Sequence, residues 1–356
     1  MTRPIQAIIH PAALVNNLLV ARQAAPTAKL MSVVKANGYG HGLLRVARAL
    51  EESDGFAVLS VEEAVRLREA GFTQPILLLE GVFQSGELSI VSEFGLSIVV
   101  HCAEQIEMLK RAWSPVKLNV FLKLNTGMHR LGFAPDAFPQ ALAALQACAI
   151  VGAITLMTHF ATADEAAGVS EQLARFNALT QNLVLPRSLA NSAACLRYPE
   201  THGDWVRPGI MLYGASPIAT QRAADLGLEP AMSLVSEIIS VQNVKAGEQV
   251  GYGGTYSAER AMRIGIVACG YADGYPRHAG TGTPILVMGQ RTRTLGRVSM
   301  DMLAVDLSEM PDAGAGSPVT LWGAGLPVEK VARAAGTISY ELLCARAERV
   351  PVVEGA

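Results

Sequence analysis

Short apolar runs rich in β-branched residues recur along the first 213 positions, and stretches with helical spacing of apolar residues separate most of them. Such runs predict buried strands, whereas apolar positions with a period near 3.6 predict amphipathic helices. The expected strands are residues 32–35, 56–59, 76–79, 97–100, 119–124, 154–159, 188–191 and 209–213. The expected helices include residues 12–25, 43–52, 61–70, 103–113, 137–147 and 170–183. This alternation predicts an α/β fold of the (β/α)8 barrel type, also called a TIM-like barrel.

A doubly wound open sheet is the competing arrangement for alternating strands and helices. An open sheet of that kind usually has fewer strands than the eight expected here, so the pattern favours the barrel. An additional apolar run at residues 5–9 precedes the alternation.

The pattern changes after residue 217. Short strand-like runs now follow one another, separated by Gly, Pro and Asp turns. These runs are residues 232–244, 263–269, 283–287, 292–295, 302–306 and 318–322. They predict a second, mostly β domain that follows the barrel.

The composition supports two folded domains and a small substrate. Half of the 356 residues are apolar and 17% are charged, which is ample for a large core and excludes intrinsic disorder. The net charge is −2 with the signs well mixed, so charge gives no reason to expect nucleic acid or an anionic membrane as partner.

The five cysteines lie far apart and form no C-x-x-C pair, which predicts buried thiols in a reducing compartment. No apolar segment is long enough to span a membrane, and the first residues lack the pattern of a signal peptide. We therefore expect a cytoplasmic protein. The seven histidines show no ligand spacing such as H-E-x-x-H, so no metal site is expected.

The stretch at residues 32–42, SVVKANGYGHG, carries the clearest chemistry. Lys35 stands at the exit of a predicted buried strand, where partial desolvation favours the neutral amine that attacks carbonyl groups and forms Schiff bases. The glycines of the following turn allow close approach of a ligand, and the hydroxyl of Tyr39 could reach a phosphate. A solvated lysine beside an ordinary turn is the alternative interpretation of the stretch alone.

Further polar groups follow other predicted strands, and the carboxyl ends of barrel strands form the active site. The segment KLNTGMHRLG at residues 123–132 follows the fifth strand, His159 ends the sixth, and NSAA at residues 191–194 ends the seventh. WVRPGI at residues 205–210 precedes the eighth. Each of these segments could be an ordinary polar loop. Together with Lys35, however, they lie at the ends of five predicted strands, which predicts a single active site.

These motifs, in this order, resemble those of the alanine racemases, and the resemblance runs from Pro4 to Val352. The resemblance implies an isomerase with pyridoxal 5′-phosphate bound to Lys35. It also implies an N-terminal strand, residues 1–10, that joins the C-terminal domain, a cofactor-binding barrel at residues 11–228, and a β-rich domain at residues 229–356. One departure is Gly38, where the family more often has alanine.

The resemblance also implies which residues hold the cofactor. A neutral cradle of hydroxyl and backbone donors would bind its phosphate. The cofactor-binding residues implied are Lys35, Tyr39, His159, Asn191, Ser192, Arg207, Gly209, Ile210 and Tyr340. Arg207 would face the pyridine nitrogen in place of the carboxylate found in most pyridoxal enzymes, and would keep its own proton because its pKa is far higher. His159 would orient Arg207.

The substrate would be alanine, with its carboxylate bound by the guanidinium of Arg130. Lys123 resembles a lysine that the family often carbamylates, and the carbamate would hold Arg130 in place. The family often has aspartate where this chain has Asn125, a difference not expected to change the mechanism.

Racemisation requires proton exchange on both faces of a planar carbanion, and two bases on opposite sides achieve it. By resemblance these are Lys35 and Tyr256, the latter from the second domain of the partner subunit. A homodimer with a shared active site follows. The resemblance further implies that Tyr275 is a gate that narrows the pocket, and that Met300 and Asp301 contact substrate.

Three alternatives carry different predictions. A broader amino-acid racemase or a decarboxylase would share the two-domain plan, but the expected gate and the missing secretion signal argue against a broad periplasmic enzyme. A pyridoxal-phosphate carrier protein predicts a barrel alone, and a metal-dependent barrel would need ligand spacing that is absent. The active-site residues do not distinguish D-alanine supply for peptidoglycan from L-alanine catabolism, although overall similarity favours the catabolic paralogue.

Overall fold

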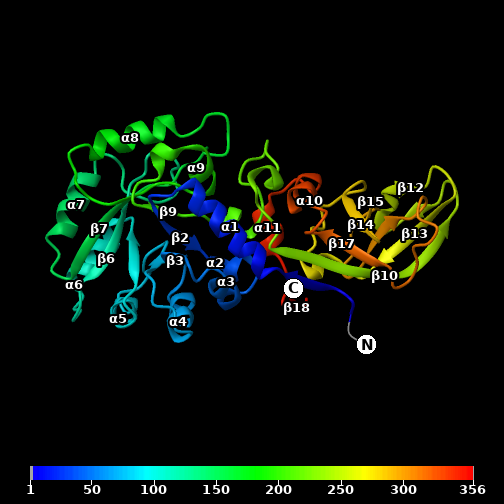
Figure 1. Cartoon of the computed structure of the whole chain (residues 1–356), viewed down its shortest axis with the longest axis horizontal. Helices are drawn as coiled ribbons and strands as arrows, with labels where there is room; N and C mark the ends of the chain where they lie inside the picture. Colours follow the sequence, from blue (N-terminus) through cyan, green and yellow to red (C-terminus); the bar gives the residue numbers. More distant parts are fainter. Residues whose placement is uncertain (1–2, 356) are drawn as a thin grey trace.

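A computed structural model describes residues 3–355 of the chain. Figure 1 shows a barrel with its surrounding helices at one end of an elongated molecule and a β-rich part at the other. No helix within the described residues combines the length and the apolar character needed to cross a bilayer.

Eight parallel strands close into a barrel, as predicted from the sequence. In order around the barrel they are β2 (Lys29–Val33), β3 (Gly55–Val58), β4 (Ile76–Leu78), β5 (Ser97–Val100), β6 (Leu118–Lys123), β7 (Val151–Met157), β8 (Arg187–Ser188) and β9 (Trp205–Val206). The barrel closes where β9 pairs with β2, with Trp205 opposite Lys29. The strands are buried over most of their length, which explains why they appear in the sequence as continuous apolar runs.

Helices surround the barrel. They are α1 (Pro11–Ala24), α3 (Leu43–Ala49), α4 (Val61–Glu69), α5 (Glu87–Glu93), α6 (Ala103–Arg111), α7 (Phe138–Gln146), α8 (Ser170–Thr180) and α9 (Ser192–Arg197). Helix α4 illustrates why these segments are helical: the side chain of Ser60 caps its N-terminus by accepting from the Glu63 amide, and Val61, Ala64 and Leu67 form its buried stripe.

The expected strand at residues 209–213 is wrong. This segment is the short 3-10 helix η2 (Ile210–Tyr213), and the eighth strand is β9, just before it. All four residues of η2 are buried, so the segment has no polar face, and an apolar run without periodicity does not distinguish a strand from a buried helical turn.

The second part is built on an eight-stranded sheet, which confirms the predicted mostly β domain. Its order is β13 (Met262–Val267), β16 (Leu303–Asp306), β15 (Gln290–Leu295), β14 (Pro284–Val287), β17 (Pro318–Trp322), β10 (Met232–Val244), β1 (Gln6–Ile9) and β18 (Val352–Glu354). Strand β1 lies between β10, antiparallel, and β18, parallel. The N-terminal strand thus belongs to this sheet, while the exact domain boundaries at residues 10 and 228 stay a prediction.

The remaining elements are short. They are β11 (Gln249–Val250), β12 (Tyr256–Ser257), α10 (Val328–Ala334), α11 (Ser339–Cys344), η1 (Pro199–Thr201), η3 (Ala223–Leu226), η4 (Tyr252–Gly254) and η5 (Tyr271–Asp273). Strands β11 and β12 pair with each other in a hairpin away from the barrel (Figure 1).

Helix α11 returns to the barrel and packs on the turn α2 (Lys35–Tyr39), which follows strand β2. The contact is close, because a Cβ atom on Gly40 would lie 2.1 Å from the carbonyl oxygen of Leu343. Arg346 donates a hydrogen bond of 2.9 Å to the carbonyl of Gly40. The C-terminal part of the chain therefore covers the lysine turn of its own barrel.

Candidate active site

A cavity of about 510 Å³ opens at the carboxyl ends of the barrel strands. Its lining residues follow seven of the eight strands and include two from helix α11. They are Val33, Lys35, Ala36, Tyr39, Leu59, Leu79, Glu80, Lys123, Arg130, Leu131, Met157, His159, Asn191, Ser192, Arg207, Gly209, Ile210, Tyr340 and Cys344. The structure thus brings together all the cofactor-binding residues expected from the sequence, with Arg130 and Lys123.

Lys35 begins a left-handed turn rather than ending a strand, since β2 stops at Val33. Ala36, Asn37 and Tyr39 have φ values of 54°, 53° and 48°, and Gly38 between them has 61°. Left-handed backbone is costly for residues with a Cβ atom and is concentrated at functional sites. The turn is held by its surroundings, for example by the Asn37 side chain, which accepts from the Leu43 amide at 2.9 Å.

The amine of Lys35 is partly withdrawn from water. Burial lowers its pKa, the positive charge of Arg130 lowers it further, and the negative charge of Glu80 opposes these effects. The direction agrees with the expected shift toward the neutral, nucleophilic amine.

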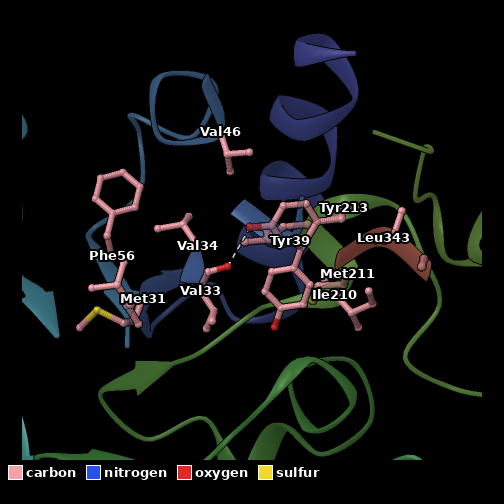
Figure 2. Packing of buried hydrophobic residues seen from close by; sticks show 14 of the residues in the cluster. Met31, Val33, Val34, Tyr39, Val46, Phe56, Ile210, Met211, Tyr213 and Leu343 are labelled. Carbon is pink, nitrogen blue, oxygen red and sulfur yellow. Dashed lines mark hydrogen bonds between the residues drawn. The ribbon is translucent and has the colours of Figure 1, made fainter. Parts of the chain in front are cut away.

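Hydroxyl groups gather at one side of the cavity. The ring of Tyr39 stacks on Tyr213 with centroids 4.4 Å apart, and Tyr340 lies tilted against it at 6.0 Å. Figure 2 shows Tyr39 and Tyr213 packed beside Ile210, with the Tyr213 hydroxyl bonded to the Val33 carbonyl. Burial raises the pKa of Tyr39 and of Tyr340, so both hydroxyls remain protonated donors.

The backbone at Gly209 lies close to the Tyr39 hydroxyl group. A Cβ atom on Gly209 would lie 2.9 Å from the Tyr39 hydroxyl oxygen, so only glycine leaves this space free. The amide of Gly209 donates to Oγ of Ser192 at 2.8 Å. Asn191 caps helix α9 by accepting from the Ala194 amide. The group offers neutral donors of the kind that bind a phosphate dianion.

Arg207 also lines the cavity, directly after β9, and is only 3% exposed. Its Nη1 donates to Ser188 Oγ at 2.7 Å, and its Nη2 donates to the carbonyls of Thr158 (2.7 Å) and Leu189 (3.2 Å). Burial lowers the pKa of Arg207 to about 9, so the guanidinium is still charged at neutral pH. Burial, followed by the charge of Arg207, holds the pKa of His159 well below its usual value, which keeps that imidazole neutral.

Lys123 ends strand β6 and is 6% exposed. Burial lowers its pKa to about 8, and repulsion from Arg207 and Arg130 contributes. No carboxylate within residues 3–355 forms an ion pair with Lys123 or Arg207. Buried cations are normally paired, so these two side chains are left to interact with groups that enter the cavity.

Four residues expected at the site lie elsewhere in the single chain. Tyr256 begins strand β12, which lies at the end of the molecule away from the barrel (Figure 1). Its hydroxyl is bonded to Met262 Sδ at 3.4 Å. Met300 is 53% exposed. Asp301 pairs with Arg349 at 2.7 Å, and none of the three lines the cavity.

Tyr275 is the fourth, and the prediction that it gates the pocket does not fit its position. Its side chain is 1% exposed and stacks on Trp322, with ring centroids 5.9 Å apart. A ring buried within its own chain lines no opening. Tyr271, four residues earlier in the same loop, is 38% exposed.

Two lining residues with titratable side chains were not singled out from the sequence. Glu80, the only carboxylate among the lining residues, follows β4, and its place after a predicted strand could have identified it. Cys344 reaches the cavity from helix α11, which carried no recognisable signal. It is exposed and Cys102 is half-buried, so the expectation of five buried thiols is wrong for these two.

Two family models match the chain. The alanine racemase N-terminal domain matches residues 9–217, and the alanine racemase C-terminal domain matches residues 231–354.

Relatives are similar over nearly the full length. The alanine racemase of Nitrosospira multiformis is 60% identical over 353 residues, covering 98% of this chain and 99% of its own. The alanine racemase of Nitrosomonas europaea is 57% identical, covering 99% of both. The crystal structure of the biosynthetic alanine racemase from Pseudomonas aeruginosa matches with a TM-score of 0.97 at 50% identity over 100% of both chains. The chain belongs to the alanine racemase family and is an isomerase.

Proposed function

We propose that this chain racemises alanine with pyridoxal 5′-phosphate bound in the barrel cavity. The observation that carries the proposal is the composition of that cavity, with Lys35, hydroxyl donors and the unpaired Arg207 around one space of about 510 Å³. An aldehyde that also carries a phosphate and a ring nitrogen fits these three kinds of group.

The residues present suit this cofactor. Tyr39, Ser192, Tyr340 and the Ile210 amide would hold the phosphate, and the amine of Lys35 would hold the aldehyde carbon. Pyridoxal phosphate, when bound, supplies an electron sink that acidifies the α-proton of the attached amino acid.

Arg207 would donate to the ring nitrogen and keep that nitrogen unprotonated. Its guanidinium has a higher pKa than a pyridine, even after burial lowers it to about 9. This arrangement would temper the electron sink that the cofactor supplies and so would limit side reactions such as transamination. His159, within 3.4 Å of Nη2, would help to orient the guanidinium.

Arg130 would bind the substrate carboxylate as a bidentate pair. Lys123 supports a second proposal about the same guanidinium. Its lowered pKa leaves part of the amine neutral near pH 8 and able to take up carbon dioxide. The nitrogen would form a bond to the carbon of carbon dioxide and release one proton to solvent. The resulting carbamate would replace a buried cation that repels Arg130 by an anion that attracts it.

Lys35 would exchange the α-proton on one face of the substrate, and Tyr256 of the partner subunit on the other. Tyr256 does not line the cavity of its own chain, which supports a second copy as its source. The proposal therefore includes a homodimer in which each β-rich part completes the site of the other subunit.

We also propose a cytoplasmic location and a biosynthetic direction. All five cysteines, which lie within the described residues, are free thiols, as expected in a reducing compartment. The description "biosynthetic" belongs to the Pseudomonas aeruginosa protein, and at 50% identity it favours D-alanine supply over the catabolic role that the sequence favoured.

An absorption spectrum of the purified protein, before and after borohydride, tests the cofactor. We expect a visible band that disappears on reduction, with the added mass on the peptide containing Lys35. In D₂O, wild type should exchange the α-proton of either enantiomer of alanine for solvent deuterium. Tyr256→Phe should lose this exchange with one enantiomer far more than with the other. A protein without the band, and unchanged by added pyridoxal phosphate, would contradict the proposal.

A further inference from the structure

The loop that carries Arg130 is closed at its base by two backbone hydrogen bonds. The amide of Asn125 donates to the carbonyl of Phe133 at 2.9 Å, and the amide of Phe133 donates to the carbonyl of Lys123 at 2.8 Å. A Cβ atom on Gly132 would lie 2.8 Å from the Asn125 amide nitrogen, so the two arms of the loop are in close contact. The base of the loop is therefore fixed to strand β6.

The side chain of Asn125 organises the interior of this loop. Its Oδ1 accepts from the amides of Gly127 (3.2 Å) and His129 (3.0 Å). These two donors determine which end of the amide is oxygen, so Nδ2 is the atom that lies 3.1 Å from Nδ1 of His129. Nδ2 can only donate, and Nδ1 of His129 must accept. The side chain of Asn125 thus binds both the backbone and the ring of His129.

The bonds from its amide and its ring to Asn125 hold His129 in a backbone conformation that is uncommon for residues other than glycine. Its φ is +55°, in the left-handed region. Arg130 is the next residue, so the direction in which its side chain leaves the backbone depends on this conformation. The guanidinium itself bonds to no residue within 3–355, although it lines the cavity. The hydrogen bonds that orient Arg130 in this structure therefore act through the backbone of its loop.

We propose that Asn125 and His129 form a clamp that positions Arg130 toward the carboxylate of the amino-acid substrate. Both are positioning residues, since neither lines the main cavity. The inference rests on the role of Arg130 under the proposed function. Asn125 binds the His129 ring through Nδ2 of its amide, whereas an aspartate at this position would bind the tautomer with the proton on Nδ1.

Replacing Asn125 in the holoenzyme tests the clamp. Asn125→Ala removes all three side-chain bonds, and we expect the KM for alanine to rise about tenfold while kcat changes less than about twofold. Binding of propionate, which keeps the carboxylate but lacks the amino group, should weaken by about the same factor in calorimetry. This second measurement does not depend on turnover. The cofactor spectrum and the melting temperature report whether the fold and the cofactor site are intact.

Conservative variants separate positioning from a general structural effect. Asn125→Asp still accepts from both backbone amides and can accept Nδ1–H from the other His129 tautomer, so its KM should stay within about twofold of wild type. His129→Asn should also retain function, because asparagine tolerates the left-handed region and can bond to Asn125. His129→Ala keeps the bonds of Asn125 to the backbone, and it serves as the test if Asn125→Ala does not fold.

Arg130→Ala distinguishes failure of the clamp from failure of the proposed function. If Arg130→Ala weakens propionate binding and raises the KM but Asn125→Ala and His129→Ala do neither, the clamp is refuted. If Arg130→Ala has no effect on either quantity, its role in carboxylate binding is wrong and the clamp has no purpose. An equal loss in Asn125→Asp and Asn125→Ala would also overturn the inference.

Discussion

Nη2 of Arg207 lies 3.4 Å from Nδ1 of His159, and the other bonds of this guanidinium go to Ser188 and to backbone carbonyls. All of these acceptors are neutral. A buried arginine held by neutral acceptors keeps a positive charge that no protein carboxylate cancels within the described residues. That charge is available to whatever occupies the cavity.

Replacing Arg207 by lysine should destabilise the cofactor-free protein by about 2–4 kcal/mol. A single ammonium group cannot reach Ser188 and the carbonyls of Thr158 and Leu189 with the geometry of the planar fork, so buried acceptors lose their donors. Urea denaturation measures the change. Arg222→Lys is the control, because Arg222 pairs with Asp225 on the surface and its replacement should leave the midpoint unchanged. Equal midpoints for both variants and wild type would contradict this account.

Lys123→Met should make the cofactor-free protein more stable at pH 7 in buffer free of bicarbonate. The pKa of Lys123 is lowered from its usual value to about 8 in the folded protein, so the unfolded chain binds more protons between that value and about 10.5. The stability of wild type relative to the variant should therefore rise with pH across this range. Below pH 8, burying the charged amine costs wild type about 3 kcal/mol of folding free energy, a cost that Lys123→Met does not have.

Denaturation of both proteins at pH 7 and pH 10 measures this dependence. Lys330→Met, at an exposed position of helix α10, should show no comparable change with pH. If wild type and Lys123→Met differ by the same amount at both pH values, burial of the charged amine is not the cause.

Gly38→Ala should cost more stability than Gly71→Ala. Both glycines have left-handed φ values, 61° and 92°, so each substitution strains the backbone by roughly 1 kcal/mol. A Cβ atom on Gly38 would also lie 2.7 Å from Cγ2 of Val46, whereas nothing lies within 4 Å at Gly71. The contact should add about 1–3 kcal/mol.

Combining Gly38→Ala with Val46→Ala tests that contact. Because the second substitution removes the clashing methyl group, the double variant should be more stable than the sum of the two single effects implies. Thermal denaturation of wild type, the two single variants and the double variant completes the cycle. If the two losses of unfolding free energy simply add in the double variant, the clash is excluded.

Mixing two inactive variants should restore activity if the site is shared between subunits. Lys35→Ala and Tyr256→Phe each disable both sites of their own homodimers. After subunit exchange in equal amounts, half of the dimers carry one variant of each kind, and one of their two sites contains both intact residues. We expect about a quarter of wild-type activity in a racemisation assay. Unmixed variants and a Lys35→Ala/Tyr256→Phe double variant are the controls, and a mixture no more active than its parts would contradict a shared site.

The alternation of apolar runs and helical spacing was enough to predict the barrel and all six strands expected in the second domain, because buried parallel strands and half-buried antiparallel strands leave regular patterns. Helices α10 and α11 were missed. Each has only six or seven residues, which is shorter than the window over which helical periodicity can be recognised.

For the site, the sequence by itself determined which barrel residues gather around Lys35, because residues that follow parallel strands meet at one end of a closed barrel. Only the tertiary structure decided what lies beyond those strand ends. The packing of α11 on Gly40 brought Cys344 to the cavity beside Tyr340, which was expected there. The tertiary structure also buried Tyr275 against Trp322 and made residues 210–213 a helical turn. Contacts of this kind join segments up to 300 or so positions apart, and they depend on the fit of side-chain shapes, which no local periodicity records.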